Sequence, residues 1–74
     1  MSMSDEQEVE VALDGRPHRV RCGTTLAALV SELGHEPRQV TTAVNGTFVR
    51  REERAAWVLQ AGDAILLFQP IVGG

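Results

Sequence analysis

The sequence predicts an α+β fold, a two-layer sandwich in which one helix covers one face of a small β-sheet. Three observations lead to this class. Apolar and polar residues alternate over 8–22, which is typical of a β-hairpin. Over 24–34 the apolar residues recur at helical spacing instead. The chain has 74 residues, which is enough for one domain with a single small core.

Residues 8–22 are expected to form an antiparallel hairpin. The stretch EVEVAL, from Glu8 to Leu13, places every second apolar side chain on one face, DGRP turns the chain, and HRVRC alternates again. This pattern predicts that Val20 and Cys22 both face inward. Cys22 is therefore interpreted as a buried structural residue rather than a redox or sulfur-relay group.

The period changes from two to about 3.6 residues in CGTTLAALVSELGHEP. Thr24 or Thr25 can cap the first turn of a helix, and Gly34 can supply a left-handed stop. Pro37 prevents any continuation. We expect one amphipathic helix of roughly nine or ten residues, whose buried side chains are Leu26, Leu29, Val30 and Leu33.

The second half of the chain predicts three more short elements and a strand. VTTAVNGTFVR indicates two strands around Asn45 and Gly46, a pair interpreted as a turn with no chemistry of its own. REERAAWVLQAGD is too short for a second full helix, so a turn or a single helical turn is expected over 52–56. AILLFQ, over 64–69, is apolar on both faces, which is typical of a strand in the middle of a sheet.

One face of this last strand is expected to meet the helix. For the other face the sequence leaves two outcomes open. Either the segment around Trp57 folds over it, or an apolar patch there awaits a partner. The patch would include one of the two alternating sets, Ile65 with Leu67 or Leu66 with Phe68.

The ends of the chain are expected to lie outside the folded domain, which we place at 8–70. Residues 1–7 are an acidic stretch without periodicity and are predicted to be a disordered leader. Residues 71–74 follow a proline, which cannot donate to a sheet ladder, and are predicted to be a flexible tail. Glycines without side chains allow close backbone approach, so we expect the tail to thread a narrow channel in a partner and deliver the carboxylate of Gly74. The threading residues are Ile71, Val72 and Gly73.

Composition excludes several classes of function. The net charge is −3, and from Val11 onward seven arginines face six acids, so no basic stripe for nucleic acid is expected. No apolar run is long enough to span a membrane, and the acidic first ten residues lack a secretion signal, so a cytoplasmic location is expected. His18 and His35 stand alone, which argues against a metal site. Glu52 and Glu53 are interpreted as solvated, so no catalytic residue of the chain's own is expected.

Two features are candidates for a partner surface. Arg50, Arg51 and Arg54 form a cationic cluster, which we interpret as a solvated face, with docking of an acidic partner as the alternative. Trp57 is either a partner anchor or a residue at the rim of the core.

From about Glu8 to Gly74 the chain resembles the ThiS/MoaD family of ubiquitin-related sulfur carriers, and within it the ThiS-type carriers of thiamin biosynthesis. The residues that carry the resemblance are AVNGTFV, LQAGDAILLFQ and the terminal GG. The resemblance implies a β-grasp fold, in which one main helix packs on a mixed five-stranded sheet whose last strand runs parallel to the first.

The resemblance also implies that the protein is a co-substrate rather than an enzyme, and that it binds no cofactor. A ThiF-like adenylyltransferase would use ATP and Mg to activate the carboxylate of Gly74. Sulfur originating from a cysteine desulfurase would then convert it to a thiocarboxylate, and a ThiG-like thiazole synthase would take the sulfur. The candidate partner surface, taken from the last strand, the cationic cluster and the single tryptophan, includes Phe68, Leu66, Arg51 and Trp57.

Two alternatives stay open within this resemblance. Arg50 stands where ThiS-type sequences often have proline, and Pro70 is similar to MoaD, the small subunit of molybdopterin synthase. A ubiquitin-like protein modifier is the other alternative. The chain contains no lysine, so lysine-linked chains of this protein cannot form, although attachment to another protein stays open.

Overall fold

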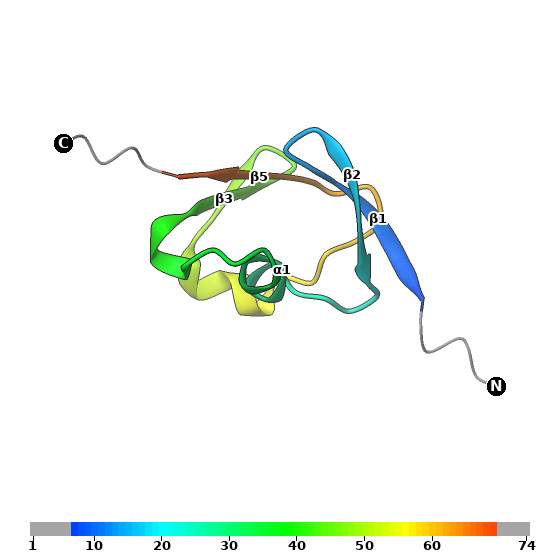
Figure 1. Cartoon of the computed structure of the whole chain (residues 1–74), viewed down its shortest axis with the longest axis horizontal. Coiled ribbons are helices and arrows are strands. Elements are labelled where there is room, and N and C mark those ends of the chain that lie inside the picture. The colour runs from blue at the N-terminus through cyan, green and yellow to red at the C-terminus, as the bar shows by residue number, and fades with distance from the viewer. Residues whose placement is uncertain (1–6, 70–74) are drawn as a thin grey trace.

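The computed structural model describes residues 7–69. In this part of the chain the helical segments lie together on one side of a sheet (Figure 1). Gln7, the last residue of the expected leader, is exposed, and its carbonyl accepts a hydrogen bond from the Cys22 N–H at 2.9 Å. Residues 1–6, Pro70 and the expected tail 71–74 lie outside the described residues.

The sheet has five strands in the order β2-β1-β5-β3-β4. Strands β1 and β5 run parallel, whereas the other neighbouring pairs are antiparallel. The expected mixed five-stranded sheet and the central place of the last strand are both confirmed. The strands are β1 Glu8–Leu13, β2 Arg16–Arg21, β3 Thr41–Val44, β4 Thr47–Val49 and β5 Ala64–Phe68.

Both hairpins turn where the sequence predicted a turn, each through two residues with positive φ, although Arg16 and Pro17 of the expected DGRP turn already belong to β2. Asp14 and Gly15 have φ of 51° and 84°, and Asn45 and Gly46 have φ of 53° and 83°. Two consecutive residues of this kind twist the backbone in the sense that matches the twist of the flanking strands. Pro17 is tolerated in β2 because that strand is at the edge of the sheet.

The helix α1, Leu26–Glu32, has seven residues and is shorter than the predicted nine or ten. At its start the Thr25 hydroxyl accepts a hydrogen bond from the Ala28 N–H at 3.1 Å, which confirms Thr25 as the cap. Leu33 was predicted to be helical but is the C-cap residue. Its side chain still packs against the core.

Two hydrogen bonds explain why α1 ends early. The Gly34 N–H donates to the Ser31 carbonyl at 3.0 Å, and the His35 N–H donates to the Val30 carbonyl at 3.2 Å. With φ of 83° at Gly34, this is the Schellman arrangement that closes a helix at its C-terminus.

The inward orientation predicted for Cys22 is wrong. Strand β2 ends at Arg21, and Cys22 lies exposed in the turn that follows. In this turn the Thr24 N–H donates to the Arg21 carbonyl at 3.0 Å. The backbone therefore leaves the extended conformation before Cys22, and the strand alternation no longer applies there.

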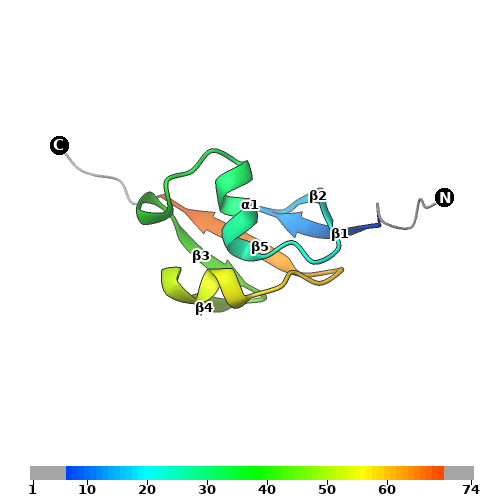
Figure 2. The ribbon, with the colours of Figure 1, turned by 90° about the horizontal axis from the view of Figure 1, so that it is seen from below.

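The two longer helical segments cover the same face of the sheet. Viewed from below, α1 and the 3₁₀ helix η3, Arg51–Ala56, lie in front of the strands (Figure 2). The Leu26 N–H donates to the Trp57 carbonyl at 2.8 Å, which ties the segment after η3 to the start of α1. Of the two outcomes left open by the sequence, the segment around Trp57 therefore does not fold over the second face. A shorter 3₁₀ helix, η2, spans Pro37–Gln39.

The core lies between the sheet and this helical layer. Its buried side chains come from all five strands, from α1 and from the segment before β5. Because β5 alternates, Ile65 is fully buried in this core whereas Leu66 and Phe68 point to the opposite face. The core members are Val11, Val20, Leu26, Leu29, Val44, Val49, Leu59 and Ile65.

Candidate functional site

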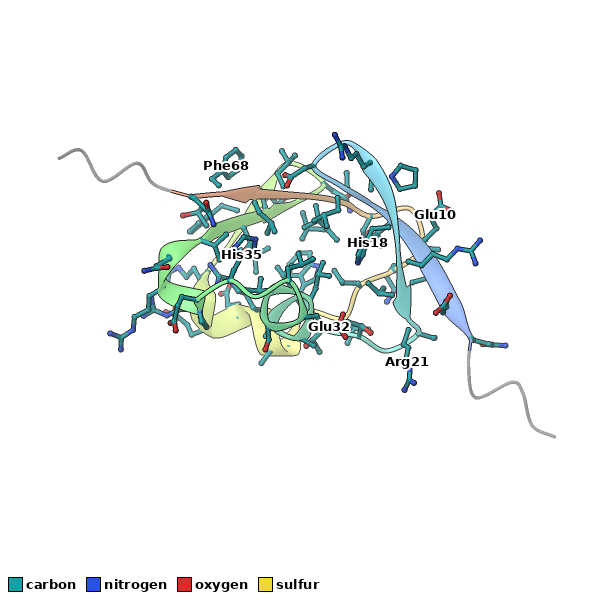
Figure 3. All side chains as sticks on the ribbon, viewed as in Figure 1. Glu10, His18, Arg21, Glu32, His35 and Phe68 are labelled. Carbon is teal, nitrogen blue, oxygen red and sulfur yellow. The ribbon has the colours of Figure 1, made fainter. Side chains whose placement is uncertain are left out.

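Three large apolar side chains gather on the face of the sheet that α1 does not cover. Ala43 of β3 lies opposite Phe48 of β4 on one side and opposite Leu66 of β5 on the other. Phe68 follows two residues after Leu66 and therefore lies on the same face. Phe48, Leu66 and Phe68 are 60%, 41% and 51% exposed, and we call them the outer patch. Figure 3 shows Phe68 on the side of the sheet away from the helical layer.

Strand β5 holds this patch next to the start of the tail. Its parallel pairing with β1 ends at Leu13 and Ile65. Beyond that point the Leu67 N–H donates to the Asp14 carboxylate at 3.1 Å. At Gln69, the last described residue, the side-chain amide nitrogen lies 3.0 Å from His35 Nδ1. The strand is thus held on both sides almost to the point where the tail begins.

The start of β5 is organised by a polar pair that joins two distant sequence motifs. Asn45 Nδ2 donates to Asp63 Oδ1 at 3.0 Å, and the Ala64 N–H donates to Asn45 Oδ1 at 2.9 Å. The other carboxylate oxygen of Asp63 accepts from the Gln60 N–H at 2.8 Å. The interpretation of Asn45 as a turn residue alone was incomplete, because its side chain also holds the chain at the entry to β5.

A cationic hollow of about 370 Å³ adjoins the outer patch. We call it the arginine hollow, because four arginines line it and Glu52 is the acid among its lining residues. Phe48 belongs both to this lining and to the outer patch. The full lining is Pro37, Arg38, Val40, Thr41, Phe48, Arg50, Arg51, Glu52 and Arg54.

The interpretation of Arg54 as part of a solvated face is wrong. Arg54 is 3% exposed. Its Nε donates to Thr42 Oγ1 at 3.1 Å. Its two terminal nitrogens donate to the carbonyls of Pro37 at 3.0 Å and Val40 at 2.6 Å. Burial lowers the pKa of Arg54, and the positive charge of the neighbouring Arg51 lowers it further.

The structure brings three of the predicted surface residues together and places the fourth, Trp57, elsewhere. Leu66 and Phe68 share the outer patch, and Arg51 lies beside it at the arginine hollow. Trp57 is half-buried and packs against the core on the helical side. Phe48 was not among the predicted surface residues, although the alternation in TFV, with Val49 buried, places its side chain outward.

The sequence also raised the questions of a metal site, a membrane span and an acid pair, and the described part of the chain answers each of them. Over residues 7–69 there is no group of three or more His, Cys, Asp and Glu side chains that could hold a metal ion. In the same range no helix is long and apolar enough to cross a membrane. Glu52 and Glu53 are exposed, as expected.

Comparisons with known proteins agree with this geometry. A family model described as the ThiS family matches residues 5–74. The sulfur carrier protein ThiS of Escherichia coli strain K12 is 32% identical over 66 residues, which cover 89% of this chain and all of that protein. The crystal structure of the thiamine biosynthesis protein ThiS from Geobacter metallireducens superposes with a TM-score of 0.77 at 26% identity, covering 89% of this chain and all of the other. This match confirms the β-grasp fold.

A thiazole synthase from Magnetococcus marinus is 38% identical to this chain over 66 residues. The aligned region covers 89% of this chain but 20% of that protein. The chain therefore corresponds to about one fifth of that relative, and the match concerns a carrier-sized part of it.

Proposed function

Because this chain belongs to the ThiS family and is a sulfur carrier protein, we propose that the carboxylate of Gly74 is the group that carries the sulfur. The observation that supports this most directly is the family match, which extends through Gly73 and Gly74. The geometry of the described residues agrees with it, because β5 and the outer patch stand immediately before the tail. The tail residues Ile71, Val72 and Gly73 would then thread the active site of a partner.

The chemistry explains why partners are required. A terminal carboxylate has a pKa of about 3.5, so it is ionised at neutral pH and is a poor electrophile. A ThiF-like adenylyltransferase would use Mg and ATP to form an acyl adenylate at Gly74. The terminal sulfur of a persulfide originating from a cysteine desulfurase would displace AMP and form an acyl disulfide, and a thiol reductant would cleave this disulfide to leave a thiocarboxylate on Gly74. The carrier itself would supply no catalytic side chain and no cofactor.

We propose a ThiG-like thiazole synthase as the enzyme that accepts the sulfur. The similarity to one fifth of the Magnetococcus marinus thiazole synthase supports this pairing. The cytoplasmic location expected from the sequence stays a prediction, and single attachment of this chain to another protein stays an open alternative.

We propose the outer patch as the surface that docks on the adenylyltransferase. Phe48, Leu66 and Phe68 expose apolar area that burial in an interface would remove from water. The patch ends one residue before the last described position, so a partner seated there would receive the tail directly.

The test is a sulfur-loading reaction with the adenylyltransferase, ATP, Mg, cysteine desulfurase, cysteine and a thiol reductant, followed by intact-mass measurement. We expect a mass increase equal to replacement of one oxygen by sulfur, located at Gly74 by fragmentation. A variant with one alanine added after Gly74 is expected to gain no such mass. Equal loading of that variant without trimming would overturn the proposal.

The exposed thiol of Cys22 requires a control in this experiment. A persulfide on Cys22 would add a whole sulfur atom rather than exchange it for oxygen, and a reducing agent would remove it. The Cys22→Ser variant is expected to load sulfur at Gly74 as well as the parent chain does.

A further inference from the structure

The arginine hollow concentrates positive charge in a chain whose net charge is −3. Among residues 7–69 the ion pair within 4.0 Å joins Arg19 and Glu8, on β2 and β1. In this part of the chain the four arginines of the hollow form no ion pair, and they outnumber its acid, Glu52. The charges of the exposed Arg38, Arg50 and Arg51 are therefore available to an external anion.

The base of the hollow is rigid. A guanidinium has five N–H groups, and the structure shows three hydrogen bonds from Arg54, each to a neutral acceptor. Two N–H groups therefore have no acceptor among the described residues, and the bonds that exist do not neutralise the cation. Around this fixed group, Arg38, Arg50 and Arg51 are exposed and free to close on an anion.

The hollow and the outer patch form one continuous surface. Phe48 lines the hollow and belongs to the patch. Thr41, another lining residue, lies directly opposite Phe68 in the sheet. A protein that covers the patch near the start of the tail therefore also meets the arginines.

We propose that the arginine hollow receives an aspartate or glutamate side chain from the enzyme that adenylates Gly74. This inference rests on the proposed function and names the polar half of its docking surface. Charge complementarity carries it, because a carboxylate is the protein anion that pairs with guanidinium groups in a bidentate manner. Rim charges of this kind steer association and set specificity.

A phosphate of ATP is a less suitable occupant on grounds of distance. Six residues, 69–74, separate the end of β5 from the reacting carboxylate. An extended segment of that length reaches about 20 Å. With the tail threaded through a channel, the nucleotide at Gly74 lies far from the hollow, whereas the protein surface around the channel entrance lies against it.

The absence of lysine from the chain makes a direct test available. Arg51→Lys introduces one side-chain amine at the edge of the hollow, where carbodiimide joins amines to carboxylates in direct contact. We expect a cross-link from position 51 to an aspartate or glutamate of the adenylyltransferase, mapped by tandem mass spectrometry. Arg19→Lys, at an exposed position of β2, is the matched control; its neighbour Glu8 can give an intrachain product, so only cross-links to the adenylyltransferase are compared, and few are expected from position 19.

The energetic test compares two double variants that lose the same charge. Arg38→Gln with Arg51→Gln is expected to raise the KM for the carrier in ATP–pyrophosphate exchange about tenfold at low salt, with kcat unchanged. Arg19→Gln with Arg21→Gln is expected to change KM less than about twofold. The first effect should shrink in high salt. All four side chains are exposed, so both variants should fold.

The outcomes distinguish a failure of this inference from a failure of the proposed function. If the parent chain is not adenylated at all, the proposed function fails. If it is adenylated but position 51 gives no more cross-link than position 19, or both double variants behave alike, the hollow does not receive a carboxylate. A rise in the KM for ATP, with the KM for the carrier unchanged, would indicate a nucleotide phosphate and would also overturn the inference.

Discussion

At the scale of single residues, Arg54 joins three parts of the helical side of the fold. From η3 it donates to the carbonyls of Pro37 and Val40, and to the hydroxyl of Thr42 in β3. Thr42 is itself fully buried and donates onward to the Val49 carbonyl at 2.9 Å. A single guanidinium therefore satisfies acceptors from η2, from the chain before β3 and from β3 itself.

Replacing Arg54 should cost much more stability than replacing its exposed neighbour. Arg54→Met leaves three acceptors without their donor, and we expect a loss of about 2–4 kcal/mol in the free energy of unfolding. Arg51→Met, at an exposed position, should change it by less than about 0.5 kcal/mol. Urea denaturation followed by circular dichroism measures both. Equal losses would mean that the Arg54 hydrogen bonds contribute little.

The pair formed by Asn45 and Asp63 predicts a coupled effect on stability. Asn45→Gly keeps the positive φ but removes the amide, and Asp63→Ala removes the carboxylate. Each change should lower the free energy of unfolding by about 1–2 kcal/mol. The double variant should lose less than the sum, because both changes remove the same hydrogen bond. A strictly additive double-mutant cycle would contradict the pairing.

At the scale of elements, β5 serves two layers at once. Ile65 is fully buried in the core, Leu67 is half-buried on the same side, and Leu66 and Phe68 face outward. The strand needs apolar residues on both faces because one face is covered by α1 and the other, in our proposal, by a partner. This explains a continuous apolar run in a sheet that has helices on one side.

Changes in the outer patch should affect docking more than folding. Phe48→Thr with Phe68→Thr replaces two aromatic residues by β-branched threonine, which also favours strands, and we expect at most about 1 kcal/mol of lost stability. The KM for the carrier with the adenylyltransferase should rise at least about tenfold, since aromatic anchors dominate interfaces. Val58→Thr removes an exposed apolar residue that pairs with Thr25, before α1, and should leave KM unchanged. Equal effects of both variants would exclude the patch as the docking surface.

At the scale of the whole molecule, the residues that stabilise the fold are different from those that we propose to react. The core residues lie between Val11 and Ile65, and the parallel pairing of β1 with β5 joins the two ends of the described chain. In our proposal the reacting atom is at Gly74, outside this unit. A carrier can thus present a carboxylate to several enzymes without altering the body that they recognise.

A chain that ends at Gln69 should therefore fold normally and accept no sulfur. All core side chains among residues 7–69 remain, so the free energy of unfolding should stay within about 0.5 kcal/mol of the parent value. Urea denaturation and the sulfur-loading reaction measure the two properties on one sample. A large loss of stability would show that residues 70–74 contribute to the fold, and retained sulfur loading would contradict the role of Gly74.

Several elements were predictable because their signals are local. Asp14-Gly15 and Asn45-Gly46 have backbone preferences that specify a tight hairpin without help from distant residues. The cap at Thr25 depends on neighbours three residues away. Cys22 was misplaced because a local turn ended the strand early, although the alternation in the sequence continued.

The features of the site also divide into those that the sequence predicts and those that depend on tertiary contacts. The sequence by itself determined the hairpins, the helix, the apolar run of β5 and the motifs of a ThiS-type carrier, because these depend on periodicity and short-range conformational preference. Only the tertiary structure decided which face stays uncovered, that Phe48 joins the outer patch, and that Arg54 is buried. The acceptors of Arg54 lie 12 to 17 residues away along the chain. A local sequence pattern cannot predict such contacts, since they form only when η3 packs against η2 and β3.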